Sequence, residues 1–95
     1  MASYSVTVTA SYNAARAPRD TLDRLKAWVE IRDGRTLTVD DSIAPVRWTI
    51  TADYVVEAQS ARDAEAMAVD GFVAESSQAD ITAPETVLAA TGPLA

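Results

Sequence analysis

The sequence contains no cysteine and no histidine. Without cysteine the chain can form neither a disulfide nor a thiolate nucleophile or metal ligand. Without histidine it lacks the commonest general base, so Ser-His-Asp and Cys-His catalytic arrangements are excluded. The three glycines stand far apart, at positions 34, 71 and 92, and cannot form a glycine-rich phosphate loop. We therefore expect no enzymatic activity, and the sequence implies no cofactor and no metal.

Long apolar runs and clusters of basic residues are also absent. No apolar run approaches the roughly 18–20 residues that span a bilayer, and the first residues lack the basic and apolar regions of a signal peptide. Eight basic residues against fourteen acidic ones give a net charge of −6, which disfavours binding to phosphate backbones. We expect a soluble, cytoplasmic protein that binds another protein or a second copy of itself, and neither nucleic acid nor a membrane.

The chain is long enough for one domain and too short for two. It has 95 residues, of which 48% are hydrophobic, so it can build a thin two-layer core without metals or disulfides. We therefore expect residues 1–95 to form a single α+β domain, with a loosely held tail over residues 91–95.

Two segments alternate between apolar and polar residues, which is the period of a half-buried strand. Residues 4–12 place aromatic and aliphatic side chains on one side and Ser or Thr on the other. Residues 46–58 show the same alternation and are long for a strand in a small domain. Shorter strands are predicted at residues 36–39 and 86–90.

Two helices are predicted between these strands. Leu22, Leu25, Trp28 and Val29 share one helical face, with Asp20 or Thr21 as a cap and Gly34 as a left-handed terminator. Residues 27–39 also fit a hairpin around an Asp-Gly turn, so the state of residues 27–35 stays open.

The second helix should begin after Ser60, with Asp63 in a capping box, and end near residue 78. The resulting order β-α-β-β-α-β predicts a ferredoxin-like fold, with two helices on one face of an antiparallel four-stranded sheet.

The face of this sheet without helices is the candidate interaction surface. It should carry rows of hydroxyl side chains, which can be solvated or can pack against a partner. All six aromatic residues are predicted on the opposite, core-facing side, which argues against a sheet that stacks RNA bases. The candidate interface residues are Thr7, Thr9, Thr49, Thr51 and Val55.

Two groups of acidic residues were considered as sites of chemistry. Asp40, Asp41 and Ser42 form the densest set of oxygen ligands, but they lack the spacing of an EF-hand and fit a solvated loop. Asp53 and Glu57 share one strand face at a separation of roughly 13 Å, which is too far for a pair of glycosidase carboxylates. We therefore expect both groups to be solvated.

Residues 56–68 read V-E-A-Q-S-A-R-D-A-E-A-M-A, a strand end followed by a capping serine and an alanine-rich helix. This join, together with the preference for arginine over lysine, resembles small ferredoxin-like accessory proteins of actinobacteriophages. The resemblance implies no catalytic residues and favours a phage or mobile-element protein that binds something.

Three functions therefore remain open. The first is a non-catalytic, homodimeric protein-interaction module that associates through the open sheet face or a strand edge. The second is an acidic decoy that inhibits a basic nucleic-acid-binding protein, which would require clustered carboxylates. The third is a small-ligand binding domain, which would require a concave pocket with converging polar groups.

Overall fold

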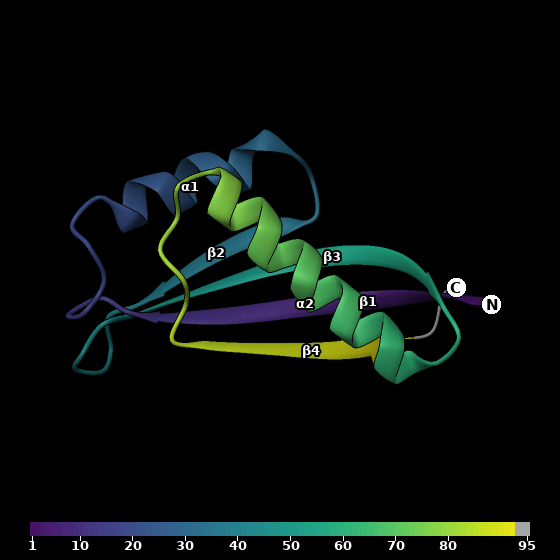
Figure 1. The fold of residues 1–95 in the computed structure, drawn as a ribbon. Coiled ribbons are helices and arrows are strands. Elements are labelled where there is room, and N and C mark those ends of the chain that lie inside the picture. The colour runs from purple at the N-terminus through teal and green to yellow at the C-terminus, as the bar shows by residue number, and fades with distance from the viewer. Residues whose placement is uncertain (93–95) are drawn as a thin grey trace.

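A computed structural model of the protein describes residues 1–92 (Figure 1). The elements follow the predicted order: β1 Ala2–Asn13, α1 Thr21–Ile31, β2 Arg35–Asp40, β3 Arg47–Ala58, α2 Ala61–Gln78 and β4 Thr86–Gly92. Among these residues no helix is both long and apolar enough to cross a membrane.

The four strands form one antiparallel sheet in the order β2-β3-β1-β4. Strands β1 and β3 pair along their whole length, from Ala2 opposite Ala58 to Asn13 opposite Arg47. Figure 1 shows both helices on the same side of this sheet. The ferredoxin-like α+β arrangement is thus confirmed.

The core lies between the sheet and the helices. Alternate residues of β1 and β3 point into it, and it closes on Leu25 and Trp28 of α1 and Phe72 of α2. The rings of Trp28 and Phe72 meet edge to face, with centroids 5.5 Å apart, a preferred arrangement of aromatic pairs. Ala64 and Ala68 are buried in α2, where their small side chains let the helix approach the strands.

The open question at residues 27–35 is resolved in favour of the helix. α1 runs to Ile31, so the hairpin interpretation of residues 27–32 is wrong, and β2 begins after the turn. Gly34 has φ +87°, a conformation that favours glycine.

The start of α1 differs from the prediction in one respect. Asp20 occupies the cap position but makes no capping bond, because its backbone is helical (φ −89°, ψ −1°) rather than extended. Its carboxylate accepts from Arg24 Nε at 2.9 Å instead.

Two further points concern the long strand and the tail. The long strand predicted at residues 46–58 is central in the sheet, where β3 pairs with both β1 and β2, so it offers no free edge to a second copy. The expected loose tail is wrong for Thr91 and Gly92, which pair with β1 as part of β4. The rest of that tail, residues 93–95, lies outside the described residues.

The N-terminus of α2 is capped as predicted. The Ser60 hydroxyl accepts from the backbone N–H of Asp63 at 3.1 Å. We expect Ser60→Ala to lower the free energy of unfolding by about 1 kcal/mol, because one helical N–H loses its acceptor. The shift of the urea midpoint measures this loss. Ser77→Ala, an exposed position in the last turn of the same helix, is the control and should change stability by less than about 0.5 kcal/mol.

Candidate functional site

The face of the sheet opposite the helices is not covered by any element within residues 1–92 (Figure 1). The register sets Thr9 beside Thr51 on this face, and Thr51 beside Thr36 of β2. The next row holds Thr49 of β3 and Ser11 of β1. The predicted interface residues therefore share one face, and four strands contribute small hydroxyl side chains to it.

Two largely exposed aliphatic side chains also lie on this hydroxyl-rich face. Val55 on β3 is 71% exposed and Leu88 on β4 is 69% exposed. Leu88 lies beside Thr9 in the register and so belongs to the same face. Its place on this face was not predicted, because the pattern of residues 86–90 indicated a strand but was not used to distinguish its two faces. The alternation of Val87 and Ala89, which pack against the core, was the available signal.

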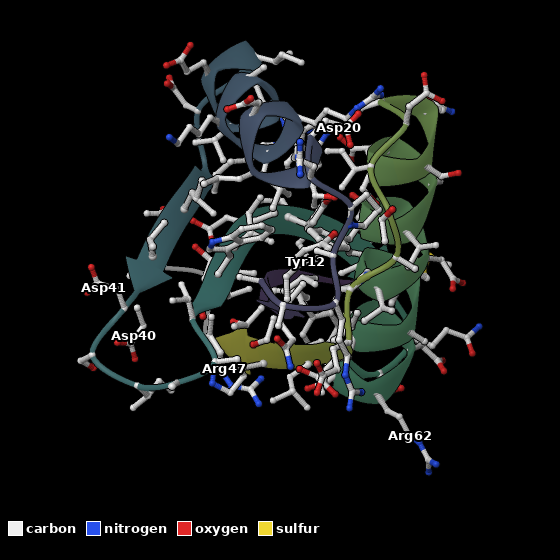
Figure 2. All side chains as sticks on the ribbon, turned by 90° about the vertical axis from the view of Figure 1, so that its left-hand side faces the viewer. Tyr12, Asp20, Asp40, Asp41, Arg47 and Arg62 are labelled. Carbon is white, nitrogen blue, oxygen red and sulfur yellow. The ribbon has the colours of Figure 1, made fainter. Side chains whose placement is uncertain are left out.

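Charged side chains occupy distinct places on this open face. Arg47 lies at one end of β3 and Glu57 near the other, and Figure 2 shows Arg47 projecting from the side of the sheet away from α1. Between them, Asp53 accepts a hydrogen bond from the Thr7 hydroxyl at 2.9 Å. The Asp53 and Glu57 carboxylates thus serve as surface polar groups. Along β3 the positive and negative charges are separated, and Asp40 of β2 lies beside Arg47 in the register.

The acidic loop after β2 is organised by its own hydrogen bonds. The backbone N–H and the hydroxyl of Ser42 donate to Asp40 Oδ1 at 3.0 and 2.5 Å. These bonds hold the pKa of Asp40 below its usual value. Within residues 1–92 no three acidic side chains are grouped closely enough to hold a metal ion. The loop is a solvated turn in which Asp40 stabilises the backbone that follows it.

The aromatic residues lie on the helix side of the sheet, as predicted. Tyr12, Trp28, Trp48 and Phe72 are buried, and Tyr4 and Tyr54 pack against the same core. Tyr12 donates its hydroxyl to the Thr82 carbonyl at 2.8 Å. None of the six is placed to stack a base on the open face.

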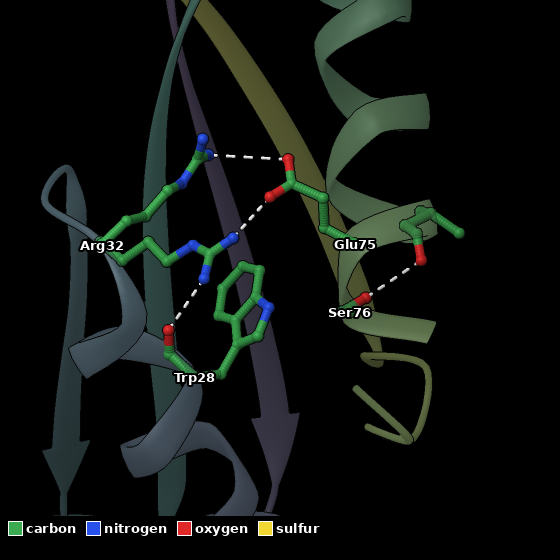
Figure 3. Close-up of polar contacts among 6 residues, drawn as sticks. Trp28, Arg32, Glu75 and Ser76 are labelled. Carbon is green, nitrogen blue, oxygen red and sulfur yellow. Dashed lines mark hydrogen bonds and ion pairs between the residues drawn. The ribbon is translucent and has the colours of Figure 1, made fainter. Parts of the chain in front are cut away.

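A buried ion pair links the two helices and β2 (Figure 3). The Arg35 side chain is only 4% exposed, and its guanidinium pairs with the Glu75 carboxylate at 2.5 Å. It also donates to the Trp28 carbonyl at 2.8 Å and lies 3.5 Å from the centre of the Trp28 ring. Arg32 approaches the other Glu75 oxygen at 3.6 Å. This cluster ties the end of α1 to α2.

The ion-pair cluster was not predicted from the sequence, and it has no clear role in chemistry. Its one carboxylate is shared by two arginines, and the Arg35 guanidinium is also held by a carbonyl and a ring. The Tyr54 hydroxyl beside it is buried and has no hydrogen-bond partner in the described part of the chain. Burial, and then the negative charge of Glu75, raise the pKa of Tyr54 to about 12. The cluster is therefore a structural clamp.

This arrangement gives little support to the two alternative functions, the acidic decoy and the small-ligand binding domain. The acidic residues that could serve a decoy are spread over the open sheet face, the loop after β2 and α2: Asp40, Asp41, Asp53, Glu57, Asp63, Glu65, Asp70 and Glu75. Of these, Glu75 is engaged by two arginines. A groove between α1 and β2 contains Lys26, Glu30 and Arg35. The Arg35 guanidinium there is engaged by Glu75 and the Trp28 carbonyl, while its buried Nε lacks a partner within the described residues. Within residues 1–92 the acidic side chains are therefore not gathered on one side.

Comparison with known proteins yields no relative from which a function could be transferred. Neither a protein-family model nor a curated protein sequence matches this chain.

Proposed function

We propose that this protein is a non-catalytic interaction module that forms a homodimer through the open face of its sheet. One observation carries the proposal. A four-stranded sheet leaves one face uncovered by any element within residues 1–92, and this face presents hydroxyl rows with two largely exposed aliphatic side chains. A sheet covered on one side only must solvate its other face or bury it against a partner.

The size of the open face is consistent with this proposal. Its strands contain 12, 6, 12 and 7 residues. At about 3.3 Å per residue and about 4.8 Å between strands, they cover about 600 Å². Two copies would bury at most about 1,200 Å² together, which is at the lower end of specific interfaces. We therefore expect a reversible dimer, in keeping with the role of a cytoplasmic accessory protein of a phage or mobile element.

The mass in solution tests this proposal. Light scattering over a concentration series should rise from the mass of one chain, 10.1 kDa, towards twice that value. Val55→Lys should keep the protein monomeric, because it places an unpaired charge in the interface. Val73→Lys is the matched control, since Val73 is an exposed valine of α2 on the opposite side of the sheet, and it should leave dimerisation unchanged. A wild-type mass that stays at one chain at the highest attainable concentration would contradict the proposal.

A further inference from the structure

We infer that the two copies are related by a two-fold axis that runs across the strands, so that Arg47 of each copy faces Glu57 of the other. This inference rests on the proposed homodimer and specifies its geometry. It follows from the charges on β3, which are ordered from one end of the strand to the other. Arg47 and Glu57 lie ten positions apart, roughly 33 Å along an extended strand.

Two kinds of two-fold axis can stack identical sheets face to face. An axis parallel to the strands, through the middle of the sheet, would place β3 of one copy over β1 of the other. Residues that lie side by side across the strands form a row, and each row would face the same row of the second copy. Arg47 would then lie over Asn13, and Glu57 over Ser3, because these residues share rows in the β1–β3 register. Neither charge would gain an opposite partner.

An axis across the strands places β3 over β3 and reverses its direction. The midpoint between positions 47 and 57 is Ala52, so an axis that passes beside Ala52 brings each Arg47 to the Glu57 end of the second copy. A two-fold interface is self-complementary, so the same contact forms twice. Val55 then packs over Thr49, and an aliphatic side chain meets a methyl group rather than a charge.

The centre of this interface contains Asp53, whose like charge must be accommodated. Asp53 lies one position from the midpoint, so the carboxylates of the two copies approach one another. Each already accepts a bond from the Thr7 hydroxyl of its own chain, and Thr51 of the second copy faces it as a further hydroxyl donor. These hydroxyl donors offset part of the repulsion between the two carboxylates, and the two outer Arg47–Glu57 pairs act against the remainder.

Charge exchange between positions 47 and 57 tests the inference. Arg47→Glu alone gives two acidic ends, and Glu57→Arg alone gives two basic ends, so each variant should dimerise at least about tenfold more weakly than the wild type. An equimolar mixture of the two variants should form a heterodimer, because every contact again joins opposite charges. The double variant Arg47→Glu/Glu57→Arg should recover the homodimer. Arg62→Glu, which reverses an exposed charge on α2 that points away from the sheet (Figure 2), should change nothing.

The possible outcomes separate this inference from the proposed function. Sedimentation velocity on the single variants, their mixture and the double variant measures all the affinities, and circular dichroism confirms that each variant is folded. A wild type that dimerises while both single variants retain its affinity overturns the axis but leaves the homodimer standing. A wild type that never dimerises overturns both. Weak single variants that recover affinity on mixing support both.

Discussion

Replacing Glu75 with alanine is expected to lower the free energy of unfolding by about 2–3 kcal/mol. The change leaves the Arg35 guanidinium in a site where its side chain is only 4% exposed, without its carboxylate partner. Loss of one partner from a fully buried pair costs about 3–5 kcal/mol. The expected loss is smaller here because the Glu75 side chain remains 33% exposed. A domain of this length has a total stability of roughly 5–14 kcal/mol, so the loss is a substantial fraction.

The same argument predicts that a double variant will be more stable than the single one. Arg35→Met/Glu75→Leu removes both charges and fills the site with apolar side chains, which is often neutral or stabilising in buried pairs. Urea denaturation with an unchanged slope measures both effects. Asp70→Ala, at an exposed position of α2, is the control and should stay within about 0.5 kcal/mol of the wild type. If Glu75→Ala is no less stable than this control, the pair does not stabilise the fold.

The order of the elements was predictable because it is encoded in local patterns. The strict alternation along residues 4–12 and 46–58 shows which side of each strand is buried, and Ser60 and Gly34 mark helix ends by their chemistry. Since one side of the sheet is apolar throughout, its other side had to be the open face. The positions of Thr7, Thr9, Thr49, Thr51 and Val55 on that face therefore follow from the sequence.

The ion-pair cluster was not predictable in the same way. Arg35 and Glu75 are forty positions apart, and their contact depends on how α2 lies against α1 and β2. The alternation of β2 does indicate that Arg35 points inward, since it shares its side of the strand with Leu37 and Val39. An arginine at an inward position must find a carboxylate or carbonyl partner, but the alternation alone does not say which.

A helix end was predictable only where the capping side chain forms a hydrogen bond with the helix backbone. Ser60 caps α2 as its chemistry suggests, whereas Asp20 gives its carboxylate to Arg24. The end of α2 carries no glycine. Asp80 takes the left-handed conformation there with φ 58°, a state that aspartate tolerates better than most residues. Competing local hydrogen bonds thus decide what a capping residue does.

Stability should fall steeply between about pH 10 and pH 12, because two tyrosines fold in their neutral form. Burial raises the pKa of Tyr12 to about 12, and burial together with Glu75 raises that of Tyr54 to about 12. In the unfolded chain a tyrosine loses its proton near pH 10. Between these values the unfolded state binds fewer protons than the folded state, so stability declines as pH rises. Tyr12, which is 2% exposed, should account for about 2 kcal/mol of this decline.

Phenylalanine variants separate the titration from the hydrogen bond. At neutral pH, Tyr12→Phe should lower the free energy of unfolding by about 1 kcal/mol, because the Thr82 carbonyl loses its donor. Tyr54→Phe should not lower it, since the Tyr54 hydroxyl is buried without a partner. Between about pH 8 and pH 11, both variants should lose less stability than the wild type, with the larger effect for Tyr12→Phe. Tyr4→Phe, at a partly buried position, is the control. Urea midpoints at the two pH values measure the differences, and a wild-type decline that persists in the combined Tyr12→Phe/Tyr54→Phe variant would show that other groups cause it.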